Sequence, residues 1–195
     1  NKQTMSSVKV ITPPTDYPIT IAGARDFLQV GDSLDDHLIN FFLASATDYC
    51  EGYMQRALMP RTILQTMDSW PTEGFYVRWN PMLTITHIKY YDTDETLQTL
   101  DSALYRYFES NDISCISLKP TEIFPDVFDR PDAIQITYTA GYDPLGTIPA
   151  PIYNAILLET RFAYDFRTNE KIDNSPYRIA SERLMYNHMI YTYRT

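Results

Sequence analysis

The sequence contains few of the residues on which catalytic and phosphate-binding motifs depend. Its 195 residues include two cysteines, three histidines and six glycines. The histidines, His37, His87 and His188, lie in separate segments without the HxxxH or HxH spacing of metal ligands. GxSxG, Walker A and GxGxxG motifs are absent from the sequence. The sequence therefore predicts no catalytic residue, no metal and no cofactor.

The two cysteines and the apolar runs exclude two further classes of protein. Cys50 falls in a predicted helix and Cys115 in a predicted strand, as is typical of buried free thiols, and two cysteines do not make a disulfide framework. No apolar run approaches the length that spans a membrane, and the N-terminus shows no signal-peptide pattern. We expect a soluble protein, made in the cytoplasm, with no membrane partner.

Positive charge is also scarce. The formal net charge is −9, which argues against binding to nucleic-acid phosphates, because such binding requires clustered Lys and Arg. Residues 161–195 carry six basic and four acidic residues, a net charge of +2, and the rest of the chain carries −11. An acidic body with a mildly basic end is compatible with a tail that docks on an acidic partner, and equally with a solvated terminus.

Aromatic residues, by contrast, are abundant. They make up 14% of the chain, and sixteen of them are tyrosines. Tyr joins a large apolar area to a hydrogen-bonding hydroxyl, so it suits surfaces that become buried in assemblies. It suits half-buried sheets equally well, and the composition leaves both interpretations open.

The first sixty residues predict an extended arm followed by two helices. The polar, Pro-containing residues 1–18 indicate the arm, and residues 19–30 have helical spacing with Thr20 as N-cap. The next helix is the strongest of the chain. We expect Ser33 to cap it and Pro60 to end it.

The remainder predicts a sheet and then a return to helix. Residues 61–141 contain about seven alternating runs separated by turn residues, and a hairpin is expected within HIKYYDTDETLQTL. Residues 149–169 have helical spacing, with Pro151 in the first turn, where its missing N–H costs nothing. Residues 170–195 form a Tyr-rich tail or a last helix that starts near Pro176.

The predicted class is α+β. A small helical core, residues 19–60 with 149–169, carries a β-rich insertion of about seven strands, residues 61–141. Residues 1–18 form an N-terminal arm and residues 170–195 a C-terminal docking tail or helix. The helices before and after the insertion are expected to pack on each other.

Several phrases, taken in order, resemble one family of proteins. These are YPITIAGARDFLQVGDSLDDHLINFFLASATDYCEGYMQRAL, TILQTMDSWP, FYVRWNPMLTITHIKYYDTDETLQTL and ITYTAGYDPLGTIPAPIYNAILLETRFAY. Together they resemble the head–tail connector proteins of long-tailed phages and gene transfer agents, also called head-completion or adaptor proteins. The resemblance covers residues 17–168. It departs from the family pattern at Gly23, at Asp94-Glu95 in the hairpin turn and in the long aromatic tail after Asn169.

The resemblance implies a structural virion protein at the head–tail interface, without enzymatic activity. Such a protein joins the portal to the tail as a ring of about twelve subunits, with a tail-side stopper or tail-terminator protein as its other partner. DNA passes through an axial channel without specific binding. An acidic lining of that channel would repel phosphates at short range.

The hypothesis for portal docking concerns residue types that are enriched at interface hot spots. The candidates in the C-terminal tail are Tyr177, Arg178, Arg183, Tyr186, Tyr191, Tyr193 and Arg194. The alternative is a helix that packs on its own domain.

A second interpretation is a small carbohydrate- or protein-binding β module with flanking helices. Five aromatic residues of the insertion could then form a sugar-stacking face: Trp70, Tyr76, Trp79, Tyr90 and Tyr91. An enzyme with an unrecognised site is a third interpretation. Glycan binding by a monomer favours the second interpretation, whereas a ring under an electron microscope favours the connector.

Overall fold

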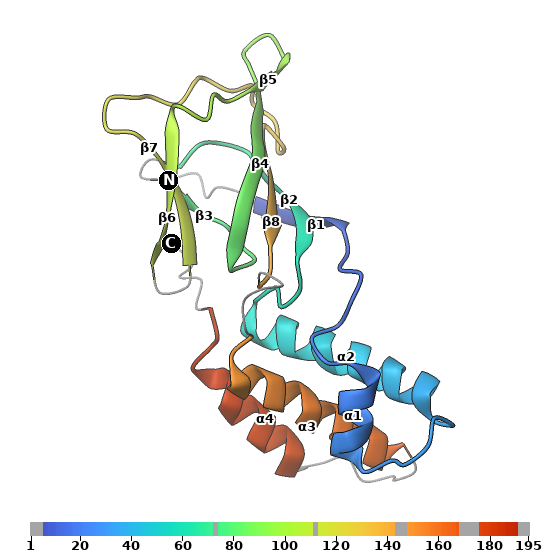
Figure 1. Cartoon of the computed structure of the whole chain (residues 1–195). Coiled ribbons are helices and arrows are strands. Elements are labelled where there is room, and N and C mark those ends of the chain that lie inside the picture. Colours follow the sequence, from blue (N-terminus) through green and yellow to red (C-terminus); the bar gives the residue numbers. More distant parts are fainter. Residues whose placement is uncertain (1–5, 72–73, 111–112, 143–147, 168–175, 191–195) are drawn as a thin grey trace. The chain divides into compact units, whose positions relative to one another are not determined.

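The computed structural model describes residues 6–71, 74–110, 113–142, 148–167 and 176–190. In this part of the chain four helices and eight strands follow one another, and the predicted α+β class is confirmed (Figure 1). The elements are β1 (Ser6–Thr12), α1 (Ile21–Leu28), α2 (Asp36–Met54), β2 (Arg61–Met67), β3 (Phe75–Tyr76), β4 (Met82–Tyr91), β5 (Leu97–Thr99), β6 (Tyr105–Ser110), β7 (Ile113–Leu118), β8 (Ile134–Ala140), α3 (Ala150–Phe166) and α4 (Pro176–Tyr186).

The elements divide into two compact units. All strands belong to one unit, residues 1–14 with 60–143, here called the β unit. All helices belong to the other, residues 15–59 with 144–195, here called the helical unit. The β unit is thus inserted in sequence between the helices, with β1 added to it from the N-terminal arm.

The β unit consists of two antiparallel sheets. The larger has the strand order β1-β2-β8-β4-β5 and the smaller the order β3-β7-β6. The seven strands expected within residues 61–141 are all present, and β4 and β5 form the predicted hairpin. The arm contributes an eighth strand, because β1 pairs with β2 from Ser6 opposite Met67 onward.

Side-chain burial in the core of the β unit alternates from one residue to the next, as expected of a strand. In β8 every second residue is buried, namely Ile134, Ile136, Tyr138 and Ala140. Burial raises the pKa of Tyr138 to about 12, and its hydroxyl accepts a hydrogen bond from the Trp79 N–H at 3.3 Å. The central strand of the larger sheet is therefore fixed by apolar packing and by a satisfied polar tip.

Two buried amides connect the sheets of the β unit. The Gln65 side chain, on β2, donates to the Tyr76 carbonyl at 3.3 Å and accepts from the Arg78 N–H at 3.0 Å. The Asn80 side chain donates to the Val77 carbonyl and accepts from the Ser114 N–H, each at 2.9 Å. Each amide satisfies backbone groups that would otherwise be buried without partners.

Three predictions concern the ends of the first two helices. Thr20 caps α1 as predicted, because its hydroxyl accepts from the Gly23 N–H at 3.1 Å. The predicted cap at Ser33 is wrong: the N-cap of α2 is Asp35, without a side-chain hydrogen bond. The predicted end at Pro60 is also wrong. The helix stops at Met54, because Gln55 adopts a left-handed conformation with φ 56°.

The helical unit packs around α2 and α3. Both helices bury one apolar stripe, and they contact each other as expected from the sequence. Pro151 lies in the first turn of α3, as predicted. The two thiols are free and buried, Cys50 on α2 and Cys115 on β7, as their positions in the sequence predicted. α4 covers α3 and α2, so part of the predicted C-terminal tail is a helix of the helical unit.

Candidate docking surface

The inner face of α4 is held to the helical unit largely by polar contacts. The Ser181 hydroxyl donates a hydrogen bond to the carboxylate of Glu159, on α3, and both side chains are buried. Met185 is fully buried one turn later. Ser181 and Met185 are the fully buried residues of α4, so its inner face combines a polar contact with apolar packing.

Arg178 lies at the centre of this attachment. Its guanidinium lies over the ring of Tyr49, on α2, at 4.8 Å, and over the ring of Phe162, on α3, at 4.9 Å. One of its nitrogens is 3.8 Å from the carboxylate of Glu159. Because cation–π contacts and a partly buried ion pair both act on it, Arg178 joins three helices of the helical unit.

Glu159 and Tyr49 titrate abnormally because of this environment. Burial raises the pKa of Glu159, and the Ser181 hydroxyl and Arg178 oppose the rise. Burial also raises the pKa of Tyr49 to about 12, and the hydrogen bond that its hydroxyl donates to Glu182 at 3.0 Å adds to the rise. The contacts of α4 with α2 and α3 therefore include two ionisable side chains, Glu159 and Tyr49, whose pKa values the fold raises.

The chain after α4 returns to the end of α2. The Ile190 N–H donates to the Met54 carbonyl at 3.0 Å, and the Arg56 side chain donates to the carbonyl of His188. These bonds fix the point from which residues 191–195 continue.

The outer face of α4 is exposed and mixed in character. Ile179, Arg183 and Tyr186 share one face, since they follow each other at helical spacing. The exposed fraction is 42% for Ile179 and 60% for Tyr186, and Arg183 is exposed between them. We call these three residues the α4 outer face. An aliphatic, a cationic and an aromatic side chain on one stripe are typical of an interface rather than of a solvated helix.

The predicted docking residues separate into three groups. Arg183 and Tyr186 belong to the α4 outer face, whereas Tyr177 is half-buried and Arg178 is engaged within the helical unit. Tyr191, Tyr193 and Arg194 lie outside the described residues. Ile179 was not among the residues predicted from the sequence, although its spacing of four from Arg183 places it on the same helix face.

The described residues contain neither a candidate metal site nor an activated cysteine. No group of three His, Cys, Asp or Glu side chains there could hold a metal ion. Burial raises the pKa of both Cys50 and Cys115, which disfavours the reactive thiolate. No helix in the described part of the chain is long and apolar enough to cross a membrane.

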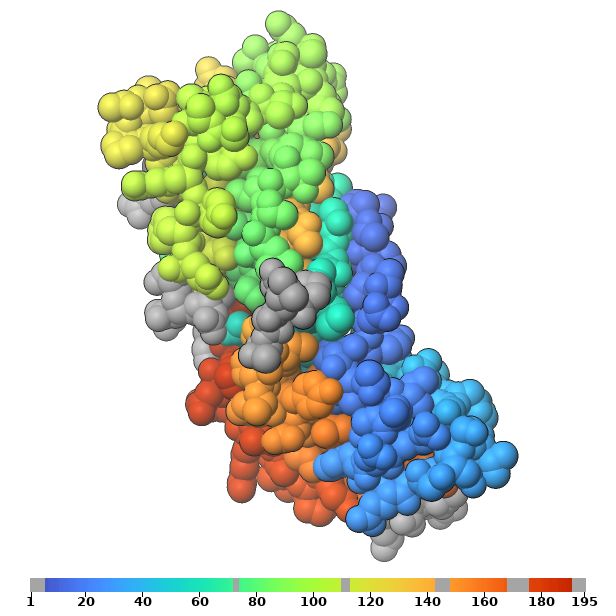
Figure 2. All heavy atoms as spheres, viewed as in Figure 1, coloured from blue at the N-terminus to red at the C-terminus, as the bar shows by residue number. Residues whose placement is uncertain are grey.

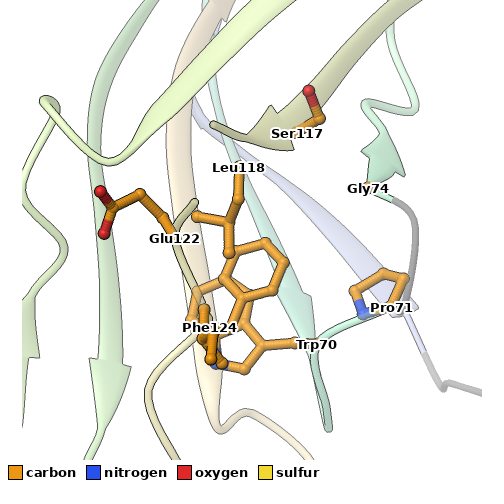
Figure 3. Close-up of a pocket in the computed structure, with 8 residues that line it drawn as sticks. Trp70, Pro71, Gly74, Ser117, Leu118, Glu122 and Phe124 are labelled. Carbon is orange, nitrogen blue, oxygen red and sulfur yellow. The ribbon is translucent and has the colours of Figure 1, made fainter. Parts of the chain in front are cut away.

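A hollow of about 380 Å³ opens on the β unit near the stacked rings of Trp70 and Phe124 (Figure 3). The two rings lie 4.3 Å apart and within 4° of parallel. Among the side chains that line the hollow, Glu122 is the only ionisable one. Ser117 also lines the hollow, so its polar side chains are one carboxylate and one hydroxyl.

The five aromatics of the carbohydrate interpretation do not form an open face. Trp70 is stacked on Phe124, and the Trp79 ring lies under Arg61 at 5.7 Å. Tyr91 is covered by Arg130 at 3.8 Å. Of the five, Tyr76 alone is exposed, and the other four rings are half-buried and contact the chain's own side chains.

The protein has an α+β architecture in which a β unit is inserted, in sequence, between the helices of a small bundle. No protein-family model matches the chain, and no curated protein sequence matches it significantly. Similar architectures do occur among solved structures.

Three solved structures share this fold across almost the whole chain. A chain in the neck of an empty gene transfer agent particle, computed with C6 symmetry, has a TM-score of 0.76 and 17% identity, and the match covers 95% of this chain and 97% of that one. A chain in the virion of a native gene transfer agent particle has a TM-score of 0.74 and 17% identity, covering 95% and 96%. A chain in the neck of a native particle, computed with C12 symmetry, has a TM-score of 0.72 and 18% identity, covering 96% and 97%. The resemblance found in the sequence is thereby confirmed for the fold.

Proposed function

We propose that the chain is a structural component of a virion neck, a head–tail connector that assembles as a ring and joins the portal to the tail. The observation that carries the proposal is the fold shared with gene transfer agent necks over at least 95% of the chain.

We expect the copies of the chain to form a closed ring, because a neck surrounds one symmetry axis. Neighbours of this fold occur in necks computed with C6 and C12 symmetry. A cyclic ring needs a heterologous interface, in which two unlike surfaces of adjacent copies meet at a rotation that closes. About twelve copies, as the sequence resemblance implies, would then surround one axis.

The portal-facing side of the connector is proposed to be the α4 outer face together with residues 191–195. This surface presents Arg183 and Tyr186 to a partner, and Tyr191, Tyr193 and Arg194 follow in the sequence. The basic character of residues 161–195 suits an acidic docking surface on the portal. A tail-side stopper or tail-terminator protein would bind the other side of the ring.

The negative charge of residues 1–160 is proposed to keep passing DNA from binding to the channel wall. Residues 1–160 carry a net charge of −11, so a channel lined by them repels the phosphates of passing DNA. The assembled ring should show no salt-dependent DNA binding in a filter or anisotropy assay. Tight binding that weakens steeply with added salt would contradict an acidic lining.

Imaging tests the proposed ring and docking directly. The purified chain, mixed with portal-bearing heads of its own particle, should appear as a ring at the portal vertex in negative-stain images. The variant Arg183→Glu with Tyr186→Ala should remain folded and lose most of this binding, whereas the control Asp48→Asn, on the exposed side of α2, should bind normally. Heads that bind both variants equally would exclude the α4 outer face as the docking surface.

A further inference from the structure

Strand β6 is the outer strand of the smaller sheet, and no other strand of the described residues pairs with its outer edge. It is the last strand of the order β3-β7-β6, and it pairs with β7 through six consecutive residues without a bulge, from Tyr105 opposite Leu118 to Ser110 opposite Ile113. A bulge, a proline or a very short length would normally blunt such an edge. β6 has none of these three features, although it carries two exposed charged residues, Arg106 and Glu109, which also restrict what can pair with an edge.

The hydrogen-bond phase shows which backbone groups of β6 face outward. The Lys119 N–H donates to the Leu104 carbonyl at 3.0 Å, so this pair is hydrogen-bonded. Bonded and non-bonded pairs alternate along an antiparallel ladder. The backbone groups of Tyr105, Tyr107 and Glu109 therefore point away from β7, and no backbone group in the described part of the chain bonds to them.

The side chains of β6 are also uncovered on both faces of the sheet. Arg106, Tyr107, Phe108 and Glu109 are all exposed, and the exposed fractions of the two rings are 55% and 47%. Tyr107 and Phe108 point to opposite faces because neighbours alternate along a strand. Figure 2 shows this yellow-green part of the β unit at the surface. Aromatic rings on both faces of the sheet can pack against the two faces of a strand that is added at this edge.

The other outer strands of the β unit differ from β6. β3 has two residues and β5 three, too few for a stable ladder. β1 is interrupted by a register shift between Val10 and Thr12. Before that shift, however, β1 offers a regular stretch from Ser6 to Val10, and Val10 and Ile11 are exposed beside it.

The edges of β6 and β1 lie on opposite sides of the β unit. β1 is the last strand of the larger sheet and β6 the last strand of the smaller, and Figure 1 shows them at the two sides of the unit. Each edge presents two neighbouring exposed apolar side chains. These are Val10 and Ile11 on β1, and Tyr107 and Phe108 on β6. Two unlike, opposed edges are the surfaces that a heterologous contact between identical subunits requires.

We propose that the β6 edge of one copy pairs with the β1 edge of the next copy, which joins their sheets across the subunit boundary. The occupant is a second copy because the opposed edges form a head-to-tail contact, as a cyclic ring needs. This inference rests on the proposed ring and adds the strands through which it closes. Main-chain bonds supply the affinity of such a contact, and the aromatic rings its specificity.

Thiol crosslinking between two single variants tests the pairing. Val10→Cys and Tyr107→Cys are prepared separately and treated with a short bifunctional thiol reagent on assembled particles, alone and as a mixture of both. The native thiols, Cys50 and Cys115, are buried and interfere little. The mixture should give a crosslinked dimer, at least about tenfold more than either variant alone. Because the edges are opposed within one unit, the crosslink must join two copies.

A pair of substitutions at one position separates backbone pairing from side-chain contact. Tyr107→Pro and Tyr107→Thr both remove the ring, but only proline removes the outward N–H, and an edge strand tolerates it there. Proline should weaken ring formation about tenfold more than threonine. Circular dichroism and thermal unfolding of both variants verify that the β unit stays folded. Equal effects of the two folded variants would overturn the strand pairing.

The outcomes distinguish this inference from the proposed function. Rings at the portal vertex that give no β1–β6 crosslink overturn the pairing and leave the connector intact. A crosslink in either single variant alone indicates a symmetric contact of like edges and overturns the pairing as well. Particles that carry the chain but show no ring in images overturn both.

Discussion

At the scale of single residues, Glu159 makes the stability of the helical unit depend on pH. Its carboxylate is buried between α3 and α4, and burial raises its pKa above the ordinary value of 4.5. The folded state therefore binds a proton more tightly than the unfolded state. Stability from this group is complete below the ordinary pKa and decreases as pH rises through the raised one.

Glu159→Gln should remove this pH dependence. Glutamine keeps the carbonyl oxygen that accepts from Ser181 and carries no charge to desolvate. The variant should lose less stability than the parent between pH 4.5 and pH 8, as measured by the midpoint of thermal unfolding. Asp48→Asn, at an exposed carboxylate of α2, is the control and should change nothing. Parallel pH profiles of parent and Glu159→Gln would contradict the account.

Gly74 is required by the backbone of the β unit. Its φ is +108°, and a Cβ atom there would lie 2.7 Å from the carbonyl oxygen of Ile116. Gly74→Ala should destabilise the protein by about 1–3 kcal/mol, measured by denaturant unfolding. Gly52→Ala, at an open position of α2, should instead stabilise it, by up to about 1 kcal/mol. The same sign for both substitutions would refute this assignment.

At the scale of elements, α4 has two faces with different roles. Its inner face attaches to α2 and α3 through Ser181 and Arg178, and its outer face is exposed. The sequence offered these roles as alternatives, a docking tail or a packing helix. One helix can fill both, because the buried and exposed residues lie on different sides of it.

Arg178→Ala and Arg183→Ala should therefore differ. The first removes the cation–π contacts with Tyr49 and Phe162 and leaves the Glu159 carboxylate without its cation, a loss of about 1–3 kcal/mol. The second should leave stability within about 0.5 kcal/mol of the parent, since Arg183 is exposed. Chemical denaturation of both variants measures the difference. Equal losses would show that the two faces are not distinct.

Most elements could be predicted from the sequence because local signals determine them. Alternation located all seven strands of the insertion, and Thr20 marked the start of α1. The end of α2 could not be found this way. The helix stops at Met54, where the C-cap Gln55, a residue without turn preference, is left-handed, and the following Ala57 and Leu58 are buried. Tertiary burial there outweighs local propensity.

The candidate site was less predictable than the fold. Residue type selected seven positions in the tail, yet type alone does not separate Arg178, which packs inside the helical unit, from Arg183, which is exposed. The strand pairing of the N-terminal arm was likewise not predictable, because its partners lie far away in the sequence. Its place beside β2 depends on partners about sixty residues away, which alternation within the arm does not reveal.

At the scale of the whole molecule, the proposed function depends on association rather than reaction. The fold is shared with neck components of gene transfer agent particles, and no group of the described residues could hold a metal ion. The α4 outer face is assigned to the portal and the strand edges of the β unit to neighbouring copies. Each assignment uses a different surface, so single variants can disable one contact and spare the other.

The most direct test of the connector is electron cryomicroscopy of particles produced with and without the chain. The account predicts a closed ring of this fold between the portal and the tail in complete particles, and heads without tails when the chain is absent. Tailed particles assembled in its absence, or complete particles with no such ring in the neck, would contradict it.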